Sequence, residues 1–193
     1  MQLPDHEHEW LTYRGAEMMQ HLGLSNGNSA IDFGCGKGRY TIPLSQALGR
    51  NGNVIAIERD TTEIDHLQKR ISTFPTQAKI APIHTSDISL ESIQGDTIDA
   101  FLAFDVLQYI EDWPRLFNAA HRVLRKTGSL HIYPAAIPHP GAVDVQQLCN
   151  VLASTNFKSK THREFTMMHN KHMINDTVYS FQPSQSANNK GLT

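Results

Sequence analysis

The sequence predicts a doubly wound α/β fold whose mainly parallel, seven-stranded sheet ends in a C-terminal antiparallel hairpin. Short apolar runs alternate with segments of helical periodicity, and a glycine-rich turn at residues 34–38 joins the first apolar run to the next helix. Two further runs near the C-terminus follow one another without a helical segment between them. Apolar strands that alternate with amphipathic helices indicate a sheet covered on both faces, which binds ligands beyond the carboxyl ends of its strands.

The first part of the chain predicts a leading helix followed by a βαβ unit. Apolar residues recur at near-helical spacing from Trp10 onward, and Gly23 ends this pattern. The next two helices end at Gly49 and Pro75, because glycine and proline commonly close helices. The predicted elements are a helix over residues 10–22, a strand over 29–33, a helix over 40–48, a strand over 53–57 that runs into Glu58, and a helix over 64–74.

The remaining sequence predicts three more strands of the same sheet and then the hairpin. A turn at Thr127 and Gly128 is expected to precede the fifth strand. The elements are strands over 79–84 and 98–104, a helix over 113–124, a strand over 129–133, a helix over 143–152, and hairpin strands over 157–168 and 177–181 joined by a polar loop. We expect a single domain over residues 1–183, with 1–28 as its N-terminal helix and lead-in, and a disordered tail over 184–193.

Composition excludes several broad classes of function. The 193 residues carry a formal net charge of −2 and no dense basic run, so nucleic acid is a poor expectation. Two cysteines, Cys35 and Cys149, cannot make a disulfide framework, which indicates a reduced, cytoplasmic protein. No apolar run approaches the roughly 20 residues of a membrane span. The histidines show no metal-ligand spacing, and no metal is predicted.

The glycine-rich turn and one acidic residue predict an adenosyl ligand. Residues 34–38 read Gly-Cys-Gly-Lys-Gly, and glycines there let backbone groups approach a ligand directly. This G-x-G-x-G spacing differs from the G-x-G-x-x-G of dinucleotide-binding proteins, in which the turn holds a pyrophosphate, and it argues against NAD. Glu58 stands at the end of the second strand, where a carboxylate can accept hydrogen bonds from both hydroxyls of an adenosine ribose.

Several segments together resemble the class I S-adenosylmethionine-dependent methyltransferases. Residues 30–38 (Ala-Ile-Asp-Phe-Gly-Cys-Gly-Lys-Gly) and 54–58 (Val-Ile-Ala-Ile-Glu) resemble the first two motifs of that family. Residues 85–88, 99–110 and 122–130 resemble its motifs after the third strand, at the fourth strand and at the turn into the fifth. The resemblance covers roughly residues 10–134 and is nearest to the small-molecule branch typical of ubiquinone and menaquinone biosynthesis. It implies a Rossmann-like enzyme with S-adenosyl-L-methionine as cofactor.

The resemblance assigns the first group of cofactor-binding residues to the turn and the second strand. Asp32 would orient the amino group of the methionine moiety, and the turn residues Gly34, Cys35 and Gly36 would line that moiety. Glu58 would bind the ribose. The Cys35 side chain is expected to pack beneath the turn and not to act as a nucleophile, because no base or second cysteine stands near it in the sequence.

A second group follows from the motifs after the third and fourth strands. Asp87 and Ile88 would hold the adenine, and Arg59 would flank it from the other side. The less favoured alternative is that Asp87 is a helix N-cap, alone or in addition to binding adenine, since aspartate often has this use after a strand. Phe104 and Asp105 would lie beside the sulfonium, where members of this family contact both cofactor and substrate.

On the acceptor side the sequence offers one candidate base. A sulfonium methyl group is already activated, so alignment of the acceptor supplies most of the catalysis. Where the acceptor is a hydroxyl or carbon acid, a general base adds a factor of about 10²–10⁴. His139, in the Pro138-His139-Pro140 loop, is the candidate, although that loop could be only a rigid connector. Gln108 stands where the family often has a histidine facing the methyl group.

Three aromatic residues have two interpretations. Tyr13, Tyr109 and Trp113 could form a wall over a substrate, but their helical positions favour the hydrophobic core.

Absent motifs narrow the methyl acceptor. Residues 104–107 read Phe-Asp-Val-Leu and lack the Asn/Asp-Pro-Pro-Tyr motif with which related enzymes methylate planar amino groups, and no Pro-Cys pair for attack on cytosine is present. With the near-neutral charge, these absences favour a small-molecule acceptor. Two alternatives stay open: a protein or RNA target delivered by a partner, and a subunit or sensor that binds S-adenosylmethionine without turnover.

Overall fold

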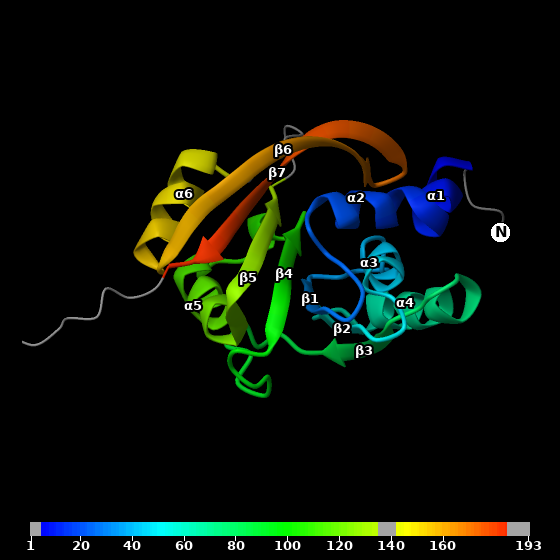
Figure 1. Cartoon of the computed structure of the whole chain (residues 1–193), viewed down its shortest axis with the longest axis horizontal. Helices are drawn as coiled ribbons and strands as arrows, with labels where there is room; N and C mark the ends of the chain where they lie inside the picture. Colours follow the sequence, from blue (N-terminus) through cyan, green and yellow to red (C-terminus); the bar gives the residue numbers. More distant parts are fainter. Residues whose placement is uncertain (1–4, 135–141, 185–193) are drawn as a thin grey trace, which may run out of the picture.

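The computed structural model of the chain describes residues 5–134 and 142–184, which are built around a seven-stranded sheet (Figure 1). The strand order is β3-β2-β1-β4-β5-β7-β6, and all neighbours from β3 to β5 are parallel. β7 runs antiparallel to both β5 and β6. The strands are β1 (Ser29–Phe33), β2 (Asn53–Glu58), β3 (Lys79–His84), β4 (Ile98–Phe104), β5 (Leu124–Tyr133), β6 (Phe157–His169) and β7 (His172–Pro183). The predicted fold class, including the antiparallel C-terminal pair, is confirmed.

Helices cover both faces of the sheet because successive strand residues point to opposite sides. Ile31 packs on the face covered by α5 and α6, whereas its neighbour Ala30 packs on the face covered by α2 and α3. The helices are α1 (Asp5–Glu9), α2 (Gly15–His21), α3 (Thr41–Leu48), α4 (Thr61–Thr73), α5 (Trp113–Val123) and α6 (Val145–Ser154). A π-helical turn (Trp10–Arg14) joins α1 to α2, and a 3-10 turn (Leu107–Tyr109) follows β4.

Aspartate side chains fix the first residue of three of these helices. Asp60, Asp112 and Asp144 each accept a hydrogen bond from a backbone N–H in the first turn of α4, α5 and α6, respectively. Such caps satisfy N–H groups that have no partner inside the helix. The Asp60 cap makes α4 begin within three residues of the end of β2, which places the start of α4 beside Glu58.

The leading helix begins earlier than predicted and packs on the helix that follows the glycine-rich turn. The predicted helix over 10–22 is observed as α1, the π-helical turn and α2 in succession. The buried Trp10 donates from Nε1 to the carbonyl oxygen of Arg39 over 2.8 Å, and Gln46 of α3 donates to the carbonyl oxygen of Leu11 over 2.7 Å. These bonds hold the N-terminal helical segment against α3.

Two strand boundaries differ from the prediction. β5 begins at Leu124, so the expected turn at Thr127 and Gly128 lies within the strand as an irregularity opposite residues 98–100. A side chain at Gly128 would come within 3.0–3.1 Å of three carbonyl oxygens, which shows how tightly the backbone passes there. β7 begins at His172, so the predicted polar loop before residue 177 is mostly strand. Backbone pairing with β6 imposes strand structure on these polar residues, whatever their side chains.

The long hairpin of β6 and β7 reaches beyond the sheet and arches over α2 (Figure 1). Arg163 of β6 donates to the carbonyl oxygen of His21 at the end of α2 over 3.2 Å. The tip of the hairpin therefore lies on the side of the molecule that holds the N-terminal helices. The tail expected over residues 184–193 falls outside the described residues, except for Ser184. Within the part of the chain that the structure describes, no helix has the length and apolar character needed to cross a membrane.

Candidate active site

The glycine-rich turn is fixed to the neighbouring strand by backbone hydrogen bonds. The N–H groups of Gly34 and Cys35 donate to the carbonyl oxygen of Ile57 over 2.9 and 3.0 Å. Gly34 and Gly36 have φ values of +74° and +50°, in the left-handed region that favours glycine. A Cβ at Gly34 would overlap the side chain of Val106, which follows β4. The turn is thus wedged between the ends of β2 and β4.

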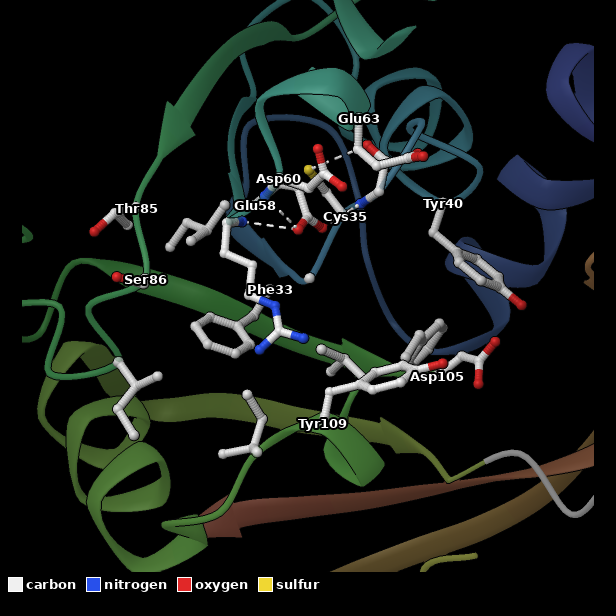
Figure 2. A pocket seen from close by; sticks show the side chains of 18 of the residues that line it. Phe33, Cys35, Tyr40, Glu58, Asp60, Glu63, Thr85, Ser86, Asp105 and Tyr109 are labelled. Atoms are coloured by element: carbon white, nitrogen blue, oxygen red, sulfur yellow. Dashed lines mark hydrogen bonds between the residues drawn. The ribbon is translucent and has the colours of Figure 1, made fainter. Parts of the chain in front are cut away.

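Gly36 faces open space, and its N–H is bound by the carboxylate of Glu58. A Cβ at Gly36 would meet only one atom within 4 Å, Oε2 of Glu63 at 3.9 Å. Glu58 accepts from the Gly36 N–H at Oε2 over 3.0 Å, and from the N–H groups of Arg59 and Asp60 at Oε1 over 2.8 and 3.0 Å. Figure 2 shows the Glu58 side chain beside Cys35 and Asp60. Glu58 therefore ties the turn to the end of β2 and leaves acceptor capacity for a ligand.

Asp32 lies behind the turn and not in the cleft. Its side chain is 2% exposed, and it accepts a hydrogen bond at Oδ2 from the Thr41 hydroxyl over 2.6 Å. Burial raises the pKa of Asp32 to about 6, against the lowering effect of the Thr41 bond and with a smaller raising effect from Glu58. Asp32 thus links the end of β1 to the first residue of α3.

A cleft of about 870 Å³ runs along the carboxyl ends of β1, β2 and β4 and past the end of β3. Apolar side chains from Phe33, Ile57 and Val106 contribute to its lining. Nine of the predicted cofactor-binding residues line it: Gly34, Cys35, Gly36, Glu58, Arg59, Asp87, Ile88, Phe104 and Asp105. The predicted base His139 lies outside the described residues. Of the predicted residues that the structure describes, Asp32 alone is not at the cleft surface.

Asp87 caps a bend and not a helix. It accepts from the backbone N–H and the hydroxyl of Ser89 over 2.9 and 2.7 Å, and these bonds are the main reason why its pKa is lowered. Arg115 of α5 forms an ion pair with it at 3.4 Å. No helix begins between β3 and β4, so the N-cap interpretation of Asp87 is wrong.

The structure corrects the expectation that Tyr13 and Tyr109 are core residues. Tyr13 is 48% exposed, and Tyr109 is 52% exposed and lines the cleft. The Arg59 guanidinium lies 6.0 Å from the centre of the Tyr109 ring, within the range of a cation–π contact. Trp113 is half-buried and donates from Nε1 to the carbonyl oxygen of Leu107 over 3.0 Å, so it does pack against the core.

The structure also places residues in the cleft that the sequence did not single out. Arg39 and Tyr40 line it immediately after the turn, and Asn170 reaches it from the tip of the β6–β7 hairpin. The Tyr40 hydroxyl donates to the carbonyl oxygen of Met168 over 2.7 Å, which fixes the hairpin tip against the start of α3. The position of Arg39 and Tyr40 directly after the turn was a usable signal. Nothing in the sequence around Asn170 indicated a place in the cleft, because only the tertiary fold brings this residue there.

Gln108 does not line the cleft but holds a residue that does. Its Nε2 donates to the backbone carbonyl oxygen and to Oδ1 of Asp105 over 3.0 and 2.9 Å. Its own Oε1 is buried and has no hydrogen-bond partner. Where the resembled family often has a histidine facing the methyl group, this chain has an amide that positions Asp105.

Comparison with known proteins identifies the family. A family model described as a methyltransferase domain matches residues 31–132, more than half of the chain, and the chain belongs to this family. The crystal structure of a SAM-dependent methyltransferase from Aquifex aeolicus superposes with a TM-score of 0.70 at 14% identity, over 89% of this chain and 91% of that one. A TehB-like SAM-dependent methyltransferase from Corynebacterium glutamicum gives a TM-score of 0.63 at 17% identity, over 89% of each chain.

Two curated proteins are similar in sequence over part of their length. A demethylmenaquinone methyltransferase of Lysinibacillus sphaericus is 26% identical over 112 residues, which cover 58% of this chain and 46% of that protein. An uncharacterized 37.1 kDa protein of a Streptomyces fradiae transposon is 30% identical over 114 residues, covering 58% of this chain and 32% of that protein. The chain therefore spans less than half the length of these curated relatives.

The family and the fold define a class I S-adenosylmethionine-dependent methyltransferase domain with S-adenosylmethionine as its cofactor. The residues of the cleft fit this cofactor. The open space at Gly36 admits a ligand against the backbone, and Glu58 offers carboxylate oxygens beside it. The cleft volume lies within the usual 300–1,000 Å³ of small-ligand sites.

Proposed function

We propose that this chain transfers the methyl group of S-adenosylmethionine to a small-molecule acceptor by in-line displacement. The observation that carries the proposal is the cleft itself. It is continuous from Asp87 past the glycine-rich turn to Asp105, so cofactor and acceptor can lie end to end. Figure 2 shows Thr85 and Ser86 toward one end of this cleft and Tyr40, Asp105 and Tyr109 toward the other.

The proposed contacts of the ribose and adenine follow from the cleft geometry. Glu58 accepts hydrogen bonds from the ribose hydroxyls, because its carboxylate is already held in place by three backbone N–H groups. Ile88 and Asp87 contact the adenine from the loop after β3, and Arg59 flanks it from the end of β2. The Arg59 contact with Tyr109 keeps the guanidinium over this end of the cleft.

The methionine moiety lies along the turn in this proposal. The backbone of Gly34, Cys35 and Gly36 lines it, and the Arg39 side chain supplies a positive charge for its carboxylate. Asp32 supports the site through Thr41 at the start of α3 and does not contact the cofactor directly, because it is buried behind the turn. Phe104 and Asp105 flank the reacting end of the cleft.

The reaction requires the protein mainly to align the acceptor with the methyl group and to exclude water from the cleft. The bound cofactor supplies a methyl group on a positively charged sulfur, which is already a good leaving group. The residues around Phe104 and Tyr109 exclude water and hold the acceptor in line with the carbon–sulfur bond, effects that are worth roughly 7–11 kcal/mol in favourable cases.

The charge of the cleft supports a small-molecule acceptor over a nucleic acid. Acidic side chains outnumber basic ones in its lining: Glu58, Asp60, Glu63, Asp87, Asp105, Glu111 and Asp112 against Lys37, Arg39, Arg59 and Arg115. A polyphosphate backbone is repelled by such a surface. The name of the Lysinibacillus relative, demethylmenaquinone methyltransferase, agrees with this choice. Both cysteines are unpaired, which supports a reducing, cytoplasmic setting as part of the same proposal.

A labelled-methyl transfer screen tests the proposal. Purified protein is incubated with methyl-labelled S-adenosylmethionine and a cell extract that contains metabolites, protein and RNA, which are then separated by size. We expect label in the small-molecule fraction from the wild type and from the control Glu91→Gln, which alters an exposed residue outside the cleft. Glu58→Gln should transfer at least about 10-fold less label. Label confined to protein or RNA would contradict the small-molecule acceptor.

A further inference from the structure

We propose that Asp105 is the general base of the methyl transfer, positioned by His169 from the β6–β7 hairpin, and that the acceptor is an acidic hydroxyl or a thiol. This inference rests on the proposed methyl transfer and adds the group that takes the proton and the class of acceptor. Asp105 lines the cleft at the end of β4, and His169 is the last residue of β6.

The backbone at Asp105 is held in an uncommon conformation that points its side chain to the reacting end of the cleft. Its φ is +54°, in the left-handed region that non-glycine residues seldom adopt. Its N–H donates to the carbonyl oxygen of Tyr133 over 2.8 Å, which fixes this conformation at the end of β5. Figure 2 shows Asp105 beside Tyr109 and toward Tyr40.

Each carboxylate oxygen of Asp105 has one partner from the protein. Oδ1 accepts from Gln108 over 2.9 Å, and Oδ2 lies 3.3 Å from Nδ1 of His169. A carboxylate has about four lone-pair positions, so two remain for a substrate. The Asp105 side chain is 27% exposed and reaches the cleft, whereas His169 is 11% exposed and lies behind it. Asp105 can therefore touch the acceptor, and His169 acts through Asp105.

A second layer of side chains sets the direction of the His169 hydrogen bond. The Tyr133 hydroxyl lies 3.2 Å from Nδ1 of His169. Burial, and also a hydrogen bond to Asp176, raise the pKa of Tyr133, so its hydroxyl stays protonated and donates to Asp176. The Tyr133 oxygen is then an acceptor for His169. With acceptors on both sides, Nδ1 carries its proton and donates it toward Asp105.

The hairpin tip is anchored at the cleft independently of this pair. Tyr40 binds the carbonyl oxygen of Met168, and Asn170 lines the cleft on the other side of His169. The Tyr40 bond holds the residue that precedes His169 in sequence. His169 therefore lies between a residue that is bound by Tyr40 and a residue that lines the cleft.

The step balances as a simple displacement. The acceptor oxygen or sulfur forms a bond to the methyl carbon, the carbon–sulfur bond of the cofactor breaks, and its electron pair stays on the sulfur. The proton of the acceptor passes to Asp105, and the electron pair of the O–H or S–H bond stays on the acceptor atom. A carboxylate is a weak base, so it suits acidic hydroxyls such as phenols and enols, or thiols, and not ordinary alcohols.

The experiment combines binding, kinetics and product chemistry. The affinity for S-adenosylhomocysteine is measured by calorimetry, and the rate is measured with the principal small-molecule acceptor found in the labelled screen. We expect Asp105→Asn to lower kcat by about 10²-fold or more and His169→Gln by about 10-fold, with the affinity for S-adenosylhomocysteine within about twofold of wild type. His172→Gln, which changes the exposed residue opposite His169 in the hairpin, should match the wild type. Mass spectrometry should show methyl ethers or thioethers.

Two results would overturn the inference. One is an unchanged kcat in both variants, and the other is a labelled product that is a quaternary ammonium or a sulfonium, because such acceptors have no proton to lose. In either case the wild type still transfers label, so the proposed methyl transfer stands. If the wild type binds S-adenosylhomocysteine but transfers no label to any acceptor, both the proposed methyl transfer and the role of Asp105 as its base are contradicted.

Discussion

Nδ1 of His169 lies 3.3 Å from Oδ2 of Asp105. His169 ends β6 and Asp105 directly follows β4, and these strands are not neighbours in the sheet, since β5 and β7 lie between them. They meet because the long hairpin extends beyond the sheet edge and arches over the N-terminal helices, as Figure 1 shows. The antiparallel C-terminal pair therefore contributes to the wall of the cleft as well as completing the sheet.

The tautomer of His169 provides the first prediction. Because Asp105 and Tyr133 both present acceptors to Nδ1, we expect neutral His169 to carry its proton on Nδ1, with Nε2 unprotonated. Long-range proton–nitrogen NMR of ¹⁵N-histidine-labelled protein distinguishes the two tautomers, with His169→Gln used to assign the signal. A proton found on Nε2 would show that Tyr133 donates to the ring, and it would contradict a hydrogen bond from Nδ1 of His169 to Asp105.

Alanine at two glycines of the turn should separate folding from binding. At Gly34 a Cβ meets a positive φ and the Val106 side chain, so Gly34→Ala should destabilise the fold by roughly 2–4 kcal/mol. At Gly36 only the positive φ opposes the change, so Gly36→Ala should lower the unfolding free energy by about 1–2 kcal/mol. The same substitution should lower the affinity for S-adenosylhomocysteine more than 10-fold, because the added methyl group occupies space left for the ligand. Urea unfolding and calorimetry measure both quantities, and equal losses of stability in the two variants would refute the distinction.

Asp32 should make stability fall as pH rises in a defined window. Its ordinary pKa is 3.8, and burial raises the pKa to about 6, so the folded protein binds this proton more tightly than the unfolded chain does. The unfolding free energy should therefore fall by about 3 kcal/mol in total between about pH 3 and about pH 7, most steeply between pH 4 and pH 6, and then level off. Asp32→Asn should lack this dependence in urea unfolding at a series of pH values. Parallel curves for the two proteins would contradict the prediction.

His131 should make the unfolding free energy rise with pH, opposite to the effect of Asp32. It is buried in β5, with Nδ1 2.8 Å from the Ser180 hydroxyl, and burial, helped by Lys160, lowers its pKa to about 3. The unfolded chain then binds this proton more readily, so the contribution of His131 to stability is present above about pH 6.5 and falls by roughly 2 kcal/mol by pH 5. His131→Gln should remove this loss, whereas the control His162→Gln, at an exposed position of β6, should retain it. The prediction fails if both variants lose stability alike below pH 6.5.

The strands whose limits are set by their own sequence could be predicted from it. β1, β3 and β4 begin and end as predicted, because each is a short apolar run closed by polar or glycine residues. The start of β5 could not be predicted, because Thr127 and Gly128 are typical turn residues that a backbone irregularity retains within the strand. The polar first half of β7 is a strand only because β6 pairs with it.

The candidate site likewise contains residues whose positions the sequence could predict and residues whose positions it could not. The positions of Gly36 and Glu58 in the cleft follow from their places at strand ends, since parallel strands end at one edge of a sheet. Tyr109 was expected in the core, but the 3-10 turn after β4 exposes it to the cleft. The contact of His169 with Asp105 depends on the path of the hairpin over the molecule, which no local pattern in either segment specifies.

Calorimetric titration with S-adenosylhomocysteine tests whether this cleft binds the cofactor. We expect measurable binding to the wild type and to the control Glu91→Ala, and an affinity lower by roughly 10- to 100-fold for Glu58→Ala, since a hydrogen bond to a charged acceptor is worth about 1.5–3 kcal/mol. The absence of heat with the folded wild-type protein, at concentrations that detect a dissociation constant of about 1 mM, would contradict the assignment of this cleft as the cofactor site.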